Sequence, residues 1–265
     1  MIENKDCLEY LETLENDSVD LILTDPPYFI GFDGGKGWDS QWKNEYDYLN
    51  WCAQWTHQCV RVLKPNRMLI VWGTLKTETF LRYKLETTDK FPVLTPQNEI
   101  IWGYNWGGRS KTNFARKHEY AWCWSKGKEF LFNDADIRVE RKLKKNIRTG
   151  QDYTQGTIPT CIWEKNNHTT SKEFCGWHPT TKNLEVLERM ILAYTNPDDT
   201  VLDIFMGSGS TAIAAENSGR KYIGCERDEE YYTKSLERIR ESNPLGVVPP
   251  EQLAQQPSNP LTDLL

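Results

Sequence analysis

Four consecutive residues near the start of the chain, Asp25-Pro26-Pro27-Tyr28, carry groups that could bind a planar amine. They follow Val19–Thr24, a short apolar run that predicts a buried strand. Proline has no N–H group and disfavours helix at the residue before it, so the chain must leave the sheet here in an extended turn. Such a turn brings a carboxylate, the carbonyl of Pro26 and an aromatic ring into one small space. These groups could grip a flat ring that carries an exocyclic NH2.

A second motif predicts a ligand-binding turn between a strand and a helix. Gly207-x-Gly209-x-x-Ala212 matches the dinucleotide fingerprint, and Glu226 follows at the end of the next predicted strand. Glycines let a ligand approach the backbone, the helix N-terminus receives an anion, and the acid binds ribose hydroxyls. This motif alone fits a nicotinamide cofactor, and a purely structural tight turn is the plainer alternative.

Two features favour S-adenosylmethionine over a nicotinamide cofactor. S-adenosylmethionine carries a sulfonium cation in place of a pyrophosphate, so the carboxylates of Asp203 and Asp25 would attract it. The Asp25 motif also has no role in hydride transfer. Ligands of open α/β sheets bind outside the carboxyl ends of the strands, and both motifs are predicted there. A cofactor and a planar base could therefore lie side by side.

The elements that must position these motifs alternate along the chain. Apolar runs predict strands at residues 19–24, 68–72, 99–104, 120–125, 201–205 and 222–225. Helical patterns fall at residues 46–63, 184–194, 208–217 and 229–240. This order predicts an α/β fold with a Rossmann-like, doubly wound and mostly parallel sheet.

Length and composition indicate an intracellular protein. A chain of 265 residues can bury a large core, and it has neither an apolar run long enough to span a membrane nor a leader-like start. Its seven cysteines form no paired framework, which is typical of reduced thiols in the cytoplasm. A zinc site from Cys161, His168, Cys175 and His178 is not expected, because their spacing is irregular. We therefore expect no metal, no membrane association and a cytoplasmic location.

The net charge of −6 conceals a basic segment. Residues 107–150 contain twelve Lys or Arg against five Asp or Glu, so the rest of the chain is strongly acidic. A basic block on an acidic body is expected of a surface that faces a polyanion. A solvated lysine-rich face is the alternative that charge alone leaves open.

The order and spacing of these motifs resemble those of the β-class DNA amino-methyltransferases, from about Asp6 to Arg238. The matching segments include Asp6-Cys7-Leu8, Asp25-Pro26-Pro27-Tyr28, Trp38-Asp39, His118-Glu119-Tyr120, His178-Pro179-Thr180-Thr181-Lys182, the loop at Gly207, and Ile223-Gly224-Cys225-Glu226. The resemblance implies the S-adenosylmethionine-dependent methyltransferase fold with an inserted target-recognition region. It also implies four parts, namely a catalytic half (1–106), a recognition region (107–177), a cofactor-binding half (178–242) and a flexible tail (243–265).

The resemblance further implies site-specific methylation of adenine N6 in double-stranded DNA, with base flipping. Asp25, Pro26, Pro27 and Tyr28 would be catalytic. The implied cofactor-binding residues are Asp6, Cys7, Asp25, Thr180, Lys182, Asp203, Phe205, Gly207, Ser208, Gly209 and Glu226, with Thr180 and Lys182 at the methionine end. The DNA-binding candidates are Trp38, Lys111, Arg116, Lys117, Arg141, Lys142, Lys144, Lys145 and Arg148. Trp38 belongs to a glycine-rich stretch, residues 29–42, which we interpret as a mobile loop that closes over the flipped base.

Several alternatives stay open at this stage. Methylation of cytosine N4 presents the same kind of amino group, and adenine is favoured by analogy only. A nicotinamide oxidoreductase and a DNA-binding module without catalysis are the rivals from other classes. A homodimer and a cognate restriction endonuclease are both compatible with the resemblance, and the sequence decides neither.

Overall fold

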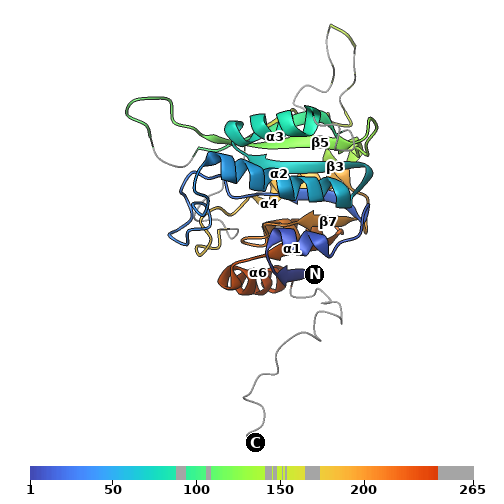
Figure 1. Ribbon diagram of the computed structural model, residues 1–265. Coiled ribbons are helices and arrows are strands. Elements are labelled where there is room, and N and C mark those ends of the chain that lie inside the picture. Colours follow the sequence, from blue (N-terminus) through green and yellow to red (C-terminus); the bar gives the residue numbers. More distant parts are fainter. Residues whose placement is uncertain are drawn as a thin grey trace, which may run out of the picture.

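One eight-stranded sheet forms the centre of the computed structural model (Figure 1). The structure describes residues 1–87, 94–105, 109–140, 145, 148–150, 152, 154–164 and 174–243. The strand order is β1-β8-β7-β2-β3-β5-β4-β6. The bounds are β1 (Ile2–Asn4), β2 (Val19–Thr24), β3 (Leu63–Gly73), β4 (Leu94–Gly103), β5 (His118–Lys126), β6 (Ile162–Glu164), β7 (Thr200–Asp203) and β8 (Lys221–Glu226).

The sheet is mostly parallel, as the alternation of elements predicted. β5 pairs antiparallel with both of its neighbours, β3 and β4, whereas the other neighbouring strands pair parallel. Helices cover both faces, so the Rossmann-like α/β fold is confirmed.

Each face of the sheet has its own group of helices. α1 (Cys7–Glu12), α2 (Glu45–Val62) and α3 (Leu75–Thr87) pack into one core cluster. α4 (Leu184–Tyr194) and α5 (Ser210–Asn217) pack into the cluster on the opposite face. α6 (Glu229–Ser242) packs beside β1 and β8 at the sheet edge, and a short 3-10 helix covers Asp134–Ile137. Figure 1 shows α2 and α3 in front of the sheet and α4 behind it.

Strands β2 and β7 lie side by side in the middle of the sheet. Leu21 pairs with Val201, and Ile22 pairs with Leu202. Because the two strands run parallel, their carboxyl ends meet at the same edge. Asp25 follows β2, and Asp203 ends β7. This register brings the two predicted motifs together although about 180 residues separate them in the sequence.

Most predicted elements are present with shifted ends. The strand predicted at 19–24 is β2 as predicted, and the helix predicted at 208–217 begins two residues later, at Ser210. The analysis did not predict α1, α3 or β6. Residues 107–177, proposed as the recognition region, contain β5 and β6, which are strands of the same sheet as the predicted catalytic half. The tail 244–265 lies outside the described residues.

No helix within the described ranges is long and apolar enough to cross a membrane.

Candidate active site

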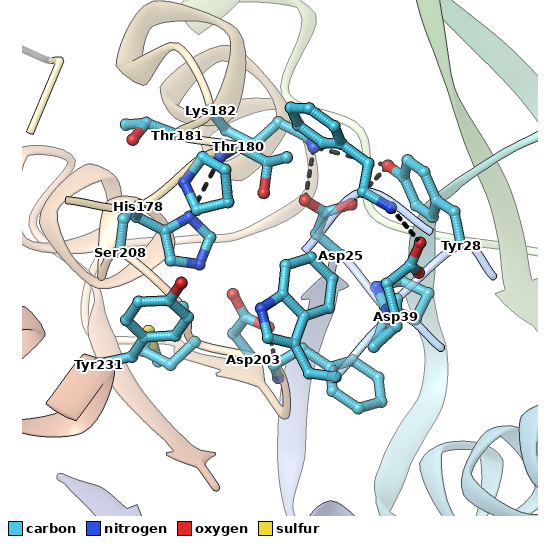
Figure 2. Close-up of a pocket in the computed structure, with 18 of the residues that line it drawn as sticks. Asp25, Tyr28, Asp39, His178, Thr180, Thr181, Lys182, Asp203, Ser208 and Tyr231 are labelled. Atoms are coloured by element: carbon cyan, nitrogen blue, oxygen red, sulfur yellow. Dashed lines mark hydrogen bonds and ion pairs between the residues drawn. The ribbon is translucent and has the colours of Figure 1, made fainter. Parts of the chain in front are cut away.

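A cavity of about 460 Å³ opens at the carboxyl ends of β2 and β7 (Figure 2). Small-molecule sites commonly enclose roughly 300–1,000 Å³. Both predicted motifs line this cavity, Asp25 and Tyr28 from one side and Asp203, Gly207 and Glu226 from the other. Both motifs therefore line a single open cavity at the predicted edge of the sheet.

The Asp25 carboxylate is held by two side chains. Tyr28 OH donates a hydrogen bond to its Oδ1 at 2.5 Å, and Lys182 Nζ donates one to its Oδ2 at 2.5 Å (Figure 2). Burial, followed by the adjacent Asp25 carboxylate, raises the pKa of the Tyr28 phenol well above its usual value. The phenol is therefore a hydrogen-bond donor at neutral pH, and it fixes the carboxylate against the ring.

The two proline carbonyls of the motif have different environments. Pro27 accepts a hydrogen bond from Tyr48 OH at 2.9 Å, which ties the turn to α2. Pro26 lines the cavity, and no hydrogen bond joins its carbonyl to any residue that the structure describes. The Pro26 carbonyl is thus an acceptor available to a ligand, beside the carboxylate of Asp25.

Lys182 lies between two carboxylates. Its ammonium nitrogen is 2.5 Å from Asp25 Oδ2 and 3.0 Å from Glu119 Oε2, and its side chain is 8% exposed. Burial alone would lower the pKa of Lys182, but the charges of Asp25 and Glu119 outweigh that effect and raise it. The structure joins Lys182 to the Asp25 motif, and its contact with the methionine end of the cofactor stays a prediction.

The glycine loop between β7 and α5 has a backbone that side chains rarely adopt. Gly207 and Gly209 have φ angles of +51° and +79°. A Cβ atom on Gly207 would lie 2.9 Å from Nε2 of His178, and one on Gly209 would lie 3.1 Å from the Ile239 side chain. Both positions therefore require glycine. Phe205 packs against Trp51 and Trp55 with ring centroids 5.5 Å apart and forms part of the cavity wall.

Asp203 is a buried carboxylate at the start of this loop. It accepts hydrogen bonds from Thr24 Oγ1 at 2.8 Å and from the Phe205 N–H at 3.0 Å. Burial raises its pKa from 3.8 to about 6, because these bonds offset only part of the lost hydration. A buried carboxylate that lines a cavity and has a raised pKa is typical of a functional site.

Glu226, at the end of β8, holds the glycine loop in place. Its Oε2 accepts from the Gly207 N–H at 2.8 Å, and its Oε1 accepts from the Asp228 N–H at 2.9 Å. Burial raises the pKa of Glu226. Each carboxylate oxygen has a second lone pair, so Glu226 can still accept a bond from a sugar hydroxyl.

The first turn after β1 supplies the far end of the cavity. Asp6 caps α1 by accepting from the Leu8 N–H at 2.9 Å, and Cys7 is buried beside it. Burial raises the pKa of the Cys7 thiol, so this group is a neutral packing side chain. Both residues line the cavity, as do Thr180 and Ser208.

His178 is a neutral ring in the cavity wall. Burial lowers its pKa from 6.5 to about 4, and the nearby Lys182 charge acts in the same direction. Its Nδ1 accepts from the Thr180 N–H at 3.3 Å, which leaves the proton on Nε2, the nitrogen nearest to Gly207. Among the described residues, no three His, Cys, Asp or Glu side chains are grouped so that they could hold a metal ion, and His168 lies outside these residues.

The glycine-rich stretch after the Asp25 motif is fixed by a buried carboxylate. Asp39 is 1% exposed and accepts from the N–H groups of Phe29, Ile30 and Phe32 at 2.6–3.1 Å. Lys36 forms ion pairs with Asp228 and Glu230 at the start of α6, and so it ties the stretch to that helix.

Trp38 lies inside this arrangement. Its ring stacks on His178 with centroids 6.5 Å apart, and it lines the cavity. The structure places Trp38 in the cavity wall near the glycine loop, and its role in DNA binding stays a prediction. Residues 29–42 are therefore a braced segment in this conformation.

The predicted DNA-binding cations separate into three groups. Arg116 lines the cavity, and Lys111 and Lys117 stand on the same β4–β5 loop. Lys145 and Arg148 are exposed on a different loop. Arg141, Lys142 and Lys144 lie outside the described residues.

The sequence analysis missed two residues of the site. Glu119 completes the contacts of Lys182, and Asp39 organises the segment after Tyr28. Both stand in segments quoted above, His118-Glu119-Tyr120 and Trp38-Asp39, so the signal was an acid beside an aromatic or imidazole ring. Neither could be placed near Asp25 without the sheet register.

Comparison with known proteins identifies the family. Residues 19–237 match the model of the N6/N4 methyltransferases, described as DNA methylase. The Type II methyltransferase M.HinfI of Haemophilus influenzae is 31% identical over 90% of this chain and 68% of its own length. The DNA adenine methyltransferase YhdJ of Escherichia coli (strain K12) is 32% identical over 88% of this chain and 80% of its own length.

Solved structures agree with the fold. The cytosine-N4-specific PvuII DNA methyltransferase superimposes with a TM-score of 0.70 at 19% identity, covering 91% of this chain and 90% of that one. The M1.HpyAVI–SAM complex gives a TM-score of 0.58 at 25% identity, covering 90% and 98%. The matched segment contains the Asp25 motif, Lys182 and the glycine loop, and on this evidence the chain belongs to the N6/N4 DNA methylase family.

Proposed function

We propose that this protein transfers a methyl group from S-adenosylmethionine to the N6 amino group of adenine in double-stranded DNA, at a specific site. The observation that carries the proposal is the position of two acceptors, the Asp25 carboxylate and the open Pro26 carbonyl. They share one cavity with the glycine loop at Gly207.

The cavity fits a cationic adenosine cofactor. Seven acidic and five basic residues line it, so its net charge is negative and would favour a positive ligand over a pyrophosphate. The acidic residues are Asp6, Asp25, Asp39, Glu119, Asp203, Glu226 and Asp228, and the basic ones are Lys5, Lys36, Arg116, Lys182 and Arg227. The glycine loop admits close approach of a ligand to the backbone, and Glu226 can accept from a ribose hydroxyl. S-adenosylmethionine supplies a methyl group on an already activated sulfonium leaving group, so the chain needs no metal for this step.

The catalytic work of the chain is to position the amine. In an aminopurine the amino lone pair is delocalised into the ring, which makes the nitrogen a poor nucleophile. Asp25 and Pro26 can accept the two amino hydrogens, and this directs the lone pair out of the ring plane. Each Asp25 oxygen retains a lone pair beyond its bond to Tyr28 or Lys182. Fixed acceptors of this kind lower the barrier by orientation and electrostatics.

Tyr28 provides the surface on which the base would stack. Chemistry on a base requires that it leave the duplex, and base–aromatic stacking is worth about 1–3 kcal/mol. The phenol is held to Asp25, so the ring and the carboxylate keep a fixed mutual position. As the nitrogen gains the methyl group it loses one proton, for which the Asp25 carboxylate is the adjacent acceptor.

We propose that residues 107–177 contribute to DNA recognition, with Lys111, Arg116 and Lys117 binding phosphates beside the cavity. Such contacts give affinity that falls steeply with salt. The adenine assignment is supported by the relatives named above, one of which is a DNA adenine methyltransferase at 32% identity. The cytosine-N4 neighbour shares the fold at 19% identity, which says nothing about the base.

The test is direct. Unmethylated DNA is incubated with the protein and S-adenosylmethionine labelled in its methyl group, then digested to nucleosides, and the labelled nucleoside is identified. We expect N6-methyl-2′-deoxyadenosine at one sequence context, found by sequencing the modified DNA. Label in N4-methyl-2′-deoxycytidine would reject the adenine assignment, and absence of label from DNA would reject the function. Asp25→Ala should abolish transfer while it retains cofactor binding measured by calorimetry.

A further inference from the structure

The β4–β5 loop, residues 104–117, carries an aromatic side chain that the fold leaves unpacked. Phe114 is 98% exposed, whereas the next most exposed large apolar side chain among the described residues, Tyr46, is 72% exposed. A single exposed apolar residue is ordinary on a protein surface. Phe114 differs from such a residue because its loop begins and ends at the active-site cavity and carries several cations.

The loop begins and ends at the active-site cavity. The Tyr104 N–H donates to the Lys117 carbonyl at 3.0 Å, which closes the base of the loop. Tyr104 and Arg116 both line the cavity. Phe114 is two residues from Arg116, so their Cα atoms are at most about 7 Å apart. Figure 1 shows this green loop extending from β5 beyond the body of the molecule.

The tip of the loop has local bonds that hold it as a turn. Ser110 Oγ accepts from the N–H groups of Thr112 and Asn113 at 3.3 and 2.9 Å. Asn113 Oδ1 accepts from the Phe114 N–H at 2.7 Å. The N–H groups of Thr112, Asn113 and Phe114 are therefore hydrogen-bonded within the tip itself, while the Phe114 ring is exposed.

The charge around Phe114 suits a nucleic-acid backbone. Residues 104–117 contain four cations and no acidic residue, the cations being Arg109, Lys111, Arg116 and Lys117. Lysine and arginine bind phosphates and release counterions. An apolar side chain flanked by such cations is the combination that proteins use to wedge into base steps and unstack them.

We propose that Phe114 enters the base stack of duplex DNA as the target base leaves it. The ring would occupy the space that the flipped base vacates, and the flanking cations would bind the phosphates on either side. The loop would thereby couple duplex opening to delivery of the base into the cavity that Tyr104 and Arg116 line. This inference rests on the proposed function, because chemistry on a base requires that the base leave the duplex.

The test compares two duplexes that contain the site identified by the sequencing experiment above. One duplex is fully paired, and the other has an abasic position opposite the target, so that the target base is already unpaired. Removal of a stacking aromatic ring costs about 1–3 kcal/mol, which corresponds to roughly a 5- to 150-fold change. We expect Phe114→Ala to lower single-turnover methylation of the paired duplex within this range. On the abasic duplex, Phe114→Ala should methylate the target within about twofold of the rate of the wild-type protein on the same duplex, because the target base is already unpaired.

Matched variants separate a wedge from general DNA binding. Phe114→Trp keeps an aromatic ring and should restore methylation of the paired duplex. Tyr83→Ala removes another exposed ring, on α3 and outside the cavity wall, and should leave both rates unchanged. Lys111→Ala should weaken binding of both duplexes equally.

Two results would overturn the inference alone, namely an equal loss on both duplexes with Phe114→Ala, or no loss on either. Failure of the wild-type protein to methylate both duplexes would instead reject the proposed function, and this inference with it. The reaction of the wild-type protein therefore distinguishes the two failures.

Discussion

The ammonium nitrogen of Lys182 lies 2.5 Å from Oδ2 of Asp25, although 157 residues separate the two in the sequence. The same nitrogen lies 3.0 Å from Glu119 Oε2. One buried cation therefore stands between two carboxylates, and together with the Tyr28 hydroxyl it holds the Asp25 carboxylate in its orientation. The arrangement makes Lys182 a positioning residue for the acceptor of the amino hydrogens.

We expect Lys182→Met to lower kcat by about 10²-fold, the scale of losing one fixed electrostatic group in an active site. Without the cation, the Asp25 and Glu119 carboxylates have no countercharge between them, and Asp25 loses one of the two side chains that orient it. The loss should appear in the single-turnover rate of methyl transfer, while the affinity for S-adenosylmethionine measured by calorimetry stays close to that of the wild type.

Lys64→Met is the matched control, because Lys64 pairs with the buried Asp20 away from the cavity. It should lower stability without lowering the single-turnover rate. An unchanged rate in folded Lys182→Met would show that the lysine does not position Asp25.

Tyr28→Phe isolates the hydrogen bond from the ring. The variant keeps the stacking surface and loses the bond that Tyr28 OH donates to Asp25 Oδ1. A hydrogen bond to a charged group contributes about 1.5–3 kcal/mol, so we expect kcat to fall by about tenfold or more. Tyr28→Ala should fall further, because it also removes about 1–3 kcal/mol of stacking. Equal rates for the two variants would show that the ring does not contact the base.

Gly207→Ala should weaken cofactor binding, because its Cβ atom would lie 2.9 Å from the His178 ring in the cavity wall. Gly219→Ala is the control. It has a φ of +69° but no atom within 4 Å of the added Cβ, and it lies outside the cavity. Both variants should lose about 1 kcal/mol of stability from backbone strain. Only Gly207→Ala should show a raised dissociation constant for S-adenosylmethionine by calorimetry, and equal affinity in both variants would contradict the assignment of the loop.

Asp203 should make stability fall as pH rises from about 4 to about 6. Its pKa is raised from 3.8 to about 6 in the folded state, so the folded protein binds more protons than the unfolded chain in that window. Asp203→Asn should therefore be more stable than wild type at pH 7, by at most about 3 kcal/mol. Because burial lowers the pKa of His178 from 6.5 to about 4, this residue makes stability rise with pH across that range. Urea denaturation of variant and wild type at the same pH cancels the His178 contribution.

A cation bound beside Asp203 should favour its charged form. Binding of S-adenosylmethionine by the wild-type protein is therefore expected to strengthen as pH rises through about 6 and to do so less in Asp203→Asn. Parallel pH profiles for the two proteins would show that Asp203 does not face the cation.

Much of the fold could be predicted from the sequence because its strands are strongly patterned. The run Val19–Thr24 is wholly buried, and Leu184–Tyr194 has the apolar spacing of a helix packed on one face. α3 was missed because its apolar residues are interspersed with lysine, threonine and glutamate. β6 was missed because three residues carry too little periodicity to be recognised.

The two motifs of the site could be predicted because each is local in sequence and stands at a strand end. The contact of Lys182 with Asp25 could not, since it depends on how the segment before α4 folds over the sheet. Trp38 is a DNA-binding candidate because it stands in the glycine-rich stretch expected to close over the flipped base. The structure stacks it on His178, an interaction that no local pattern encodes.

The bridge from Lys36 to Asp228 and Glu230 has a consequence for turnover. The segment that carries Lys36 forms part of the wall beside the glycine loop, so we expect opening of this bridge to speed exchange of the spent cofactor. The three side chains are 26–54% exposed, and salt screens ion pairs at such a surface. We expect the release rate of S-adenosylhomocysteine, followed by stopped-flow fluorescence, to rise with ionic strength in the wild type and to lose that dependence in Lys36→Met. Higher ionic strength would then have two opposite effects on turnover. It would weaken the binding of DNA, and it would speed the release of the cofactor product.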